Sequence, residues 1–160
     1  MNLTKYDQDI VAWANEQAQL MRNKQFDLLD LEHIAEEIED VGKSEQRELA
    51  SRMALLLCHL LKWQYQPARR GSSWQATIRT QRERIRRRLK KTPSLRTYLD
   101  DPEWWFDVWA DARDATTQET AIDYDQFPEQ CPWGLDLILS DHWFPEFEAP
   151  SQTPPTFPLH

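Results

Sequence analysis

Glycine and cysteine are scarce in this sequence. Three of its 160 residues are glycine, whereas average usage is roughly 7%. So few glycines argue against a turn-rich β protein and against a nucleotide site built on a Gly-rich phosphate loop. Two cysteines do not make a disulfide framework, and Cys58 lies in an apolar run. We therefore expect a buried thiol in a reducing compartment.

Long hydrophobic runs are also missing. No apolar run reaches the roughly 18 residues needed to span a membrane, and residues 1–10 lack the apolar core of a signal peptide. We expect a cytoplasmic protein that does not enter a membrane. The Cys and His residues have no zinc spacing, and the carboxylates around His33 lack the Glu-x-x-His pairs of a four-helix di-iron site. We therefore predict no metal and no cofactor.

Apolar residues at helical spacing dominate what is present. Hydrophobic residues make up 40% of the chain, which is enough for a core, and their period predicts helices throughout. We predict helices over about 5–22, from a cap at Asp27 to 41, over 44–65 and from near 73 to 91. Shorter helices are expected up to Leu99, after Pro102 and over about 134–140.

These elements predict an all-α fold: a helical bundle of four main helices plus short C-terminal helices and a Pro-rich tail. We expect one domain over residues 1–146 and the tail over 147–160. Gly42 is expected to end the second helix, as a residue free to adopt a left-handed conformation does. The second and third helices would then form an antiparallel hairpin that places Arg52 opposite His33 and His59 opposite Phe26.

Arg52 and His59 are polar residues in an otherwise apolar segment. Their spacing of seven positions puts both on one face of a helix, and it is similar to the loose R-x(4–6)-H signature of HEPN ribonucleases. In that interpretation His59 would transfer a proton at a ribose hydroxyl and Arg52 would hold the phosphate. The alternative, which we favour, is structural: Arg52 pairs with carboxylates of the second helix, and His59 is packed with a local hydrogen bond.

The charge is unevenly distributed. The formal net charge is −8, yet residues 69–96 hold eleven of the nineteen basic residues and a single acid, Glu83. This segment therefore carries about +10 and the remainder about −18. One basic stripe of the predicted helix consists of Arg82, Arg86 and Lys90 with Arg79 at its start, and the other of Arg84, Arg87, Arg88 and Lys91. The candidate partner- or nucleic-acid-binding residues are Arg79, Arg82, Arg86, Arg87 and Lys90.

Eight tryptophans are an unusually large number, and three of them lie in the segment "EWWFDVW". Helical spacing places Trp105, Val108, Trp109 and Ala112 on the inner face and leaves Trp104 off it. An exposed Trp104 beside Phe106 would mark a partner surface. The alternative is that Trp104 covers a loop.

Several ordered blocks resemble one known family. They are "YDQDIVAWANEQAQLMR", "LEHIAEEIEDVGKSE", "HLLKWQ", "SSWQATIRTQRERI", "TPSL" and "FPEQCPWGLDLIL" followed by "HWFP". Together these look like the bacterial family catalogued as domain of unknown function twenty-nine, common in cyanobacteria, over about residues 6–146. The resemblance implies a compact all-helical domain. It implies no reaction and gives no residue a role.

Three functional hypotheses follow from these features. The first is a non-enzymatic interaction or adaptor module that holds a protein partner through the basic helix or the tail, as a monomer or a homodimer. The second is an RNA- or DNA-binding module that uses the same helix, with Trp74 or Tyr98 stacking on a base. The third is the HEPN-like ribonuclease that uses Arg52 and His59.

Overall fold

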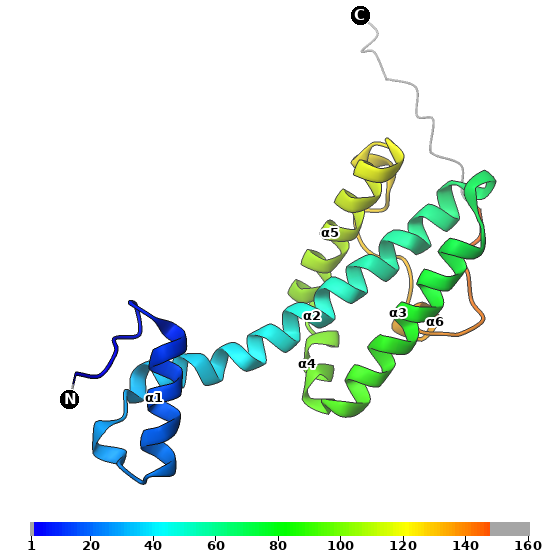
Figure 1. The fold of residues 1–160 in the computed structure, drawn as a ribbon. Helices are drawn as coiled ribbons and strands as arrows, with labels where there is room; N and C mark the ends of the chain where they lie inside the picture. The colour runs from blue at the N-terminus through cyan, green and yellow to red at the C-terminus, as the bar shows by residue number, and fades with distance from the viewer. Residues whose placement is uncertain (1, 148–160) are drawn as a thin grey trace, which may run out of the picture. The chain divides into compact units, whose positions relative to one another are not determined.

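The computed structural model describes residues 2–147, which are mostly helical (Figure 1). The α-helices are α1 (Ile10–Arg22), α2 (Leu31–Tyr65), α3 (Ser72–Lys91), α4 (Arg96–Leu99), α5 (Pro102–Thr120) and α6 (Leu135–Ile138). Short 3-10 helices are η1 (Phe26–Leu28), η2 (Pro67–Arg69), η3 (Pro93–Leu95) and η4 (Tyr124–Gln126). Residues 2–147 contain no β-strand. The predicted all-α fold class is therefore confirmed.

The chain forms two compact units, one up to Ser44 and the other from Glu45 onward. Helix α2 runs through both of them, so the single domain over residues 1–146 stays a prediction. The predicted Pro-rich tail lies outside the described residues, apart from Phe147. Within the described part of the chain, no helix is both long enough and apolar enough to cross a membrane.

The second and third helices predicted from the sequence form a single helix in the structure. Gly42 was expected to end a helix, but it lies inside the continuous helix α2 and does not have a positive φ. Glycine inside a helix costs about 1 kcal/mol relative to alanine, which is too little to stop a helix flanked by strong helix formers. The predicted hairpin is therefore wrong, and so are the pairings of Arg52 with His33 and of His59 with Phe26 that depended on it.

Helix α1 begins later than predicted. The Asp9 carboxylate accepts the Ala12 N–H at 3.1 Å and caps a helix that starts at Ile10. Thr4, which precedes the helix, donates its backbone N–H and hydroxyl to Glu16 at 2.7 and 2.8 Å. This contact ties the segment before α1 to the side of the helix.

Asp30 is the centre of the first unit. Its carboxylate accepts the Trp13 indole N–H at 3.0 Å, the His33 ring at 2.7 Å and the His33 backbone N–H at 3.4 Å. Its own N–H donates to Gln17 at 2.8 Å. Because it caps the first turn of α2, Asp30 takes the role that we predicted for Asp27.

The second unit has a hydrophobic core. The second half of α2 supplies its centre, and the predicted stripe of Leu49, Met53, Leu56 and Leu60 is fully buried. The α3 residues in the core are Ile78, Ile85 and Leu89, and the α5 residues are Trp104, Val108, Trp109 and Ala112. The inner face of α5 therefore includes Trp104, which helical spacing alone placed off that face.

Arg113 fixes the segment that follows α5. Its guanidinium is buried, lies 3.7 Å from the centre of the Tyr124 ring and donates to the carbonyls of Tyr124 and Phe127 at 3.2 and 3.4 Å. The Trp109 indole N–H donates to the Pro128 carbonyl at 2.8 Å. Carbonyls of the segment that follows α5 thus receive donors from that helix, as buried backbone polar groups require.

Candidate functional site

Helix α3 sorts its basic residues into two groups. Arg82 lies four residues after Ile78 and three before Ile85, which places it on the apolar side of the helix. Its side chain is only 1% exposed. Burial lowers the pKa of the Arg82 guanidinium from its ordinary value, while the charge of Asp141 raises it. The buried cation must therefore be stabilised by the groups around it.

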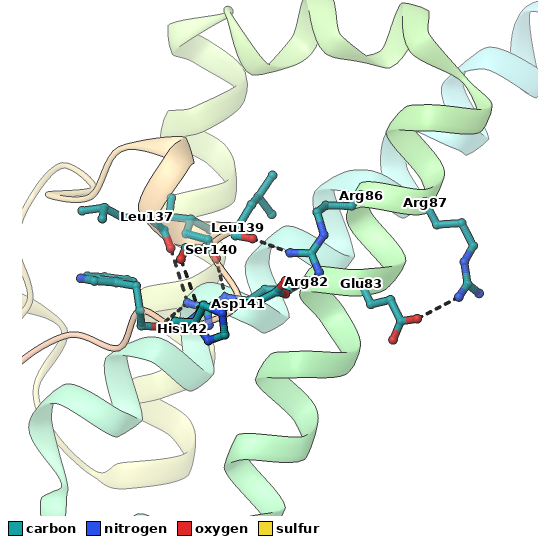
Figure 2. A network of polar contacts seen from close by, with 11 residues as sticks. Arg82, Glu83, Arg86, Arg87, Leu137, Leu139, Ser140, Asp141 and His142 are labelled. Carbon is teal, nitrogen blue, oxygen red and sulfur yellow. Dashed lines mark hydrogen bonds and ion pairs between the residues drawn. The ribbon is translucent and has the colours of Figure 1, made fainter.

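Backbone carbonyls near the end of α6 provide that stabilisation (Figure 2). Arg82 Nε donates to the Ile138 carbonyl at 2.7 Å. Its Nη2 donates to the Trp143 carbonyl at 2.7 Å and to the Leu137 carbonyl at 3.5 Å. The guanidinium also lies over the Phe144 ring, 5.4 Å from its centre. These contacts hold residues 137–144 against α3.

Arg86 extends the same arrangement by one helical turn. It donates to the Leu139 carbonyl at 2.5 Å and pairs with Asp141 at 2.6 Å. Figure 2 shows Arg82 and Arg86 pointing toward the segment after α6, while Arg87 points away from it. Two of the five predicted binding residues thus hold this segment in place, and Arg82 is removed from the surface.

The other three predicted binding residues lie on the surface. Arg79, Arg87 and Lys90 are exposed. Arg87 pairs with Glu83 at 3.0 Å on its own helix, a type of exposed pair that stabilises by only about 0.3–0.5 kcal/mol. Arg87 lines a cavity together with other basic residues, and Arg79 and Lys90 do not line that cavity.

That cavity is a cleft between α2 and the C-terminal half of α3, with a volume of about 280 Å³. We call it the basic cleft. Its lining residues are Glu45, Arg52, Arg84, Arg87, Arg88, Lys91 and Thr92. Five of the seven are cationic, and Glu45 is the one carboxylate among them. Four of these cations belong to the second basic stripe predicted on this helix. Arg87 was the single member of that stripe among the predicted binding residues.

Carboxylates of α2 hold two of the arginines. Arg88 pairs with Glu45 at 2.5 Å and lies 3.7 Å from Glu48. Arg52 pairs with Glu48 at 2.7 Å and donates to Gln81 at 3.3 Å. These contacts orient both guanidinium groups at the wall of the cleft.

Arg84 and Lys91 are the unpaired cations of the cleft. Neither forms an ion pair or a side-chain hydrogen bond with any residue in the range 2–147. Both are exposed. The cleft therefore presents a surplus of positive charge that the protein itself does not neutralise, which suits an anionic ligand.

Arg52 and His59 do not meet in this cleft. His59 is half-buried, its Nδ1 lies 3.1 Å from the Leu55 carbonyl, and it does not line the basic cleft. Burial is the main cause that lowers the pKa of His59 below its ordinary value. The local hydrogen bond that we expected for His59 is present. Arg52 does pair with a carboxylate, although the partner is Glu48, four residues earlier on the same helix, rather than a carboxylate of the predicted second helix over residues 27–41.

One family matches the chain over residues 5–144: the family described as Domain of unknown function DUF29. The chain belongs to the DUF29 family. The resemblance inferred from the sequence blocks is thereby confirmed. No curated protein and no solved structure matches the chain. The DUF29 description assigns no activity.

A sequence signal distinguished the two basic stripes. Arg82 interrupts the apolar line of Ile78, Ile85 and Leu89, which marks it as a buried residue. Arg84 and Lys91 lie off that line, seven positions apart on one face of α3. The contribution of α2 could not be read in the same way, because the wrong hairpin placed Arg52 against different residues.

Proposed function

We propose that this DUF29 protein is a non-enzymatic interaction module whose basic cleft binds an acidic segment of a protein partner. The observation that carries the proposal is the composition of the cleft, with five cations, one lining carboxylate and two cations that have no internal partner. An acidic side chain that enters the cleft would meet Arg84 and Lys91 without first breaking an ion pair.

The lining also favours a protein over a nucleic acid. Proteins that bind single strands combine basic grooves with aromatic side chains on which bases stack. The residues that line the basic cleft include no aromatic side chain, and Trp74 and Tyr98, the predicted stacking residues, are not among them. A net charge of −8 also disfavours long polyanions. A long polyanion would extend beyond the cleft, where carboxylates within a Debye length of about 8 Å would repel it.

Fluorescence anisotropy with two probes tests this proposal. The first probe is a short labelled peptide rich in Glu and Asp, and the second is a labelled single-stranded oligouridine of the same length. We expect the peptide to bind, and its affinity to fall as salt is added, because exposed charges are screened. Stronger binding of the oligouridine would overturn the proposal in favour of the nucleic-acid hypothesis.

Matched charge reversals on α3 locate the binding surface. Arg84→Glu/Lys91→Glu changes the cleft, whereas Arg79→Glu/Lys90→Glu makes the same change of charge on exposed residues of the same helix that do not line it. The first variant should weaken peptide binding by about tenfold or more, which corresponds to about 1.4 kcal/mol. Equal losses in the two variants would show that net charge, rather than the cleft, determines binding.

Capture from a native lysate would then identify the partner. The tagged protein and its Arg84→Glu/Lys91→Glu variant are used as baits, with and without nuclease treatment. A partner that survives nuclease and is lost only in the cleft variant supports the proposal, and an acidic segment in its sequence gives the peptide for the next binding measurement. Recovery that disappears with nuclease contradicts it.

A further inference from the structure

The first half of α2 carries a row of apolar side chains that is largely uncovered. Leu31, Ile38 and Val41 are 67%, 68% and 67% exposed, and Ile34 between them is half-buried. Their spacings of three and four residues place all four on one side of the helix and repeat the spacing of a seam between two packed helices. Single exposed apolar residues are ordinary on a protein surface, whereas a continuous row of them marks an interaction site.

Helix stability does not account for the residues of this row. Ile38 and Val41 are β-branched, and such residues favour a helix less than Ala, Glu or Lys does. Gly42 follows Ile38 by four residues on the same side, although glycine is among the poorest helix formers. A Cβ at Gly42 would meet no atom within 4 Å, so no neighbour described in the structure requires a glycine there. The close approach of a second backbone would require it.

Carboxylates surround the exposed row. Residues 31–42 contain five acids and no Lys or Arg. Glu37 accepts a hydrogen bond from the Tyr6 hydroxyl. The other four carboxylates are exposed and form no ion pair within residues 2–147: Glu32, Glu36, Glu39 and Asp40. They are therefore free to pair with cations of another molecule.

The apolar row and its acidic surroundings select one kind of partner. A helix packs on a helix through apolar side chains at this spacing, and opposite charges beside the seam fix its register and orientation. A second α2 would bring its own carboxylates against these, and like charges in an interface are costly. The basic helix α3 of a second copy has no large exposed apolar side chain to offer. Nucleic acids and anionic lipids would be repelled by the same carboxylates.

We propose that the first half of α2 binds a basic amphipathic helix of a protein partner. Apolar side chains of that helix cover Leu31, Ile38 and Val41, and its backbone comes close to α2 at Gly42. Its Lys and Arg side chains pair with the four exposed carboxylates. This surface does not depend on the function proposed for the basic cleft, because none of its residues lines that cleft.

Two labelled peptides of the same composition test the proposal by fluorescence anisotropy. The first has Leu at the spacing of a helical seam and Lys at the other positions, and the second has these residues in an order that forms no apolar face. We expect the first peptide to bind at least about tenfold more tightly, and its affinity to fall as salt is added. Equal binding of the two peptides would overturn the proposal, because charge alone would then account for it.

Serine substitutions locate the surface without changing the charge. Ile38→Ser/Val41→Ser removes exposed side chains from α2, and serine is about as good a helix former as these residues. The matched control Phe106→Ser/Leu137→Ser removes side chains that are 65% and 43% exposed in the other unit. We expect the α2 variant to lose about tenfold in affinity for the first peptide and the control to lose less than about twofold. Equal losses overturn the proposal.

Gly42→Ala separates binding from helix stability. Alanine makes the free helix more stable, yet it should weaken binding of the first peptide because its methyl group lies where the second backbone approaches. Tighter binding by Gly42→Ala would overturn this contact. Arg84→Glu/Lys91→Glu should bind the peptide at least as well as the unchanged protein, which keeps this test separate from that of the cleft. Sedimentation without peptide completes the test, because a dimer that Ile38→Ser/Val41→Ser abolishes would assign the surface to a second copy and overturn the proposal.

Discussion

The two compact units of the chain are stabilised in different ways. In the unit up to Ser44, the buried side chains are Trp13, Gln17 and Leu20, and polar contacts centred on Asp30 join its elements. The unit from Glu45 onward has a continuous hydrophobic core supplied by α2, α3, α4 and α5. One helix, α2, contributes to both: its first half carries the polar network and its second half the core.

This difference shows how one helix can serve two kinds of packing. Burial of apolar side chains contributes free energy in proportion to area and depends little on pH. Hydrogen bonds to charged groups contribute less and depend on protonation states. Cavities should therefore have their largest effect in the second unit, and the two units should differ in how their stability depends on pH.

The largest effect is expected from a cavity in the second unit. Leu60 is fully buried in α2, so Leu60→Ala should lower the free energy of unfolding of this unit by about 3 kcal/mol. Leu55, which is 40% exposed on the same helix, provides the control, and Leu55→Ala should cost less than about 1 kcal/mol. Chemical denaturation followed by backbone amide signals of each unit measures the two changes. Equal costs would contradict the assignment of the core.

A polar substitution in the second unit should have the next largest effect. Arg82→Met keeps most of the buried volume but leaves the carbonyls of Ile138 and Trp143 without donors, which costs roughly 1–3 kcal/mol for a buried polar group. Arg84→Met, on the exposed side of α3, should change stability by less than about 0.5 kcal/mol. Thermal unfolding compares the two variants. A stable Arg82→Met protein would show that residues 137–144 do not need the guanidinium.

The burial of Arg82 also shows what could and could not be predicted from the sequence. The helices and their apolar stripes followed from periodicity, because apolar residues at helical spacing have one stable arrangement in water. The partners of Arg82 are backbone carbonyls of a segment more than fifty residues later, which leave no trace in side-chain pattern. Trp104 is similar, since its burial depends on neighbours that the spacing of α5 alone did not identify.

Gly42 illustrates a different limit, because the sequence signal there was real but weak. A glycine can end a helix or continue it at a cost of about 1 kcal/mol, and the choice depends on the residues around it. The basic cleft required the same tertiary information. Four of the cleft's five cations were visible as a stripe on α3, but the α2 wall that encloses them was not.

Replacing Gly42 should therefore stabilise the chain. A Cβ at this position meets no atom within 4 Å, so Gly42→Ala should raise the free energy of unfolding by about 1 kcal/mol. Gly71 has equally open space but precedes α3 in an extended conformation, and Gly71→Ala should bring no such gain. Denaturation of both variants decides the point. If neither variant is stabilised, α2 is not continuous through Gly42 in solution.

The smallest effect, and the sharpest contrast between the units, is expected from pH. The hydrogen bond to Asp30 is the main cause that raises the pKa of His33 above its ordinary value of 6.5, with further help from the charges of Asp30, Glu36 and Asp7. The folded first unit thus binds a proton more tightly than the unfolded chain does. Its stability should be fully present below pH 6.5 and fall as the pH rises through the pKa of folded His33.

His59 gives the stability of the second unit the opposite dependence on pH. Burial lowers its pKa below 6.5, so the unfolded chain binds the proton more tightly. The stability of this unit should be fully present above pH 6.5 and fall as the pH drops through the pKa of folded His59. Hydrogen exchange of backbone amides in α1 and α5, measured across this range, should therefore show protection that changes in opposite directions. His33→Gln should remove the trend in α1 alone and His59→Gln the trend in α5 alone, whereas a trend of the same sign in both helices would mean that the two units unfold together.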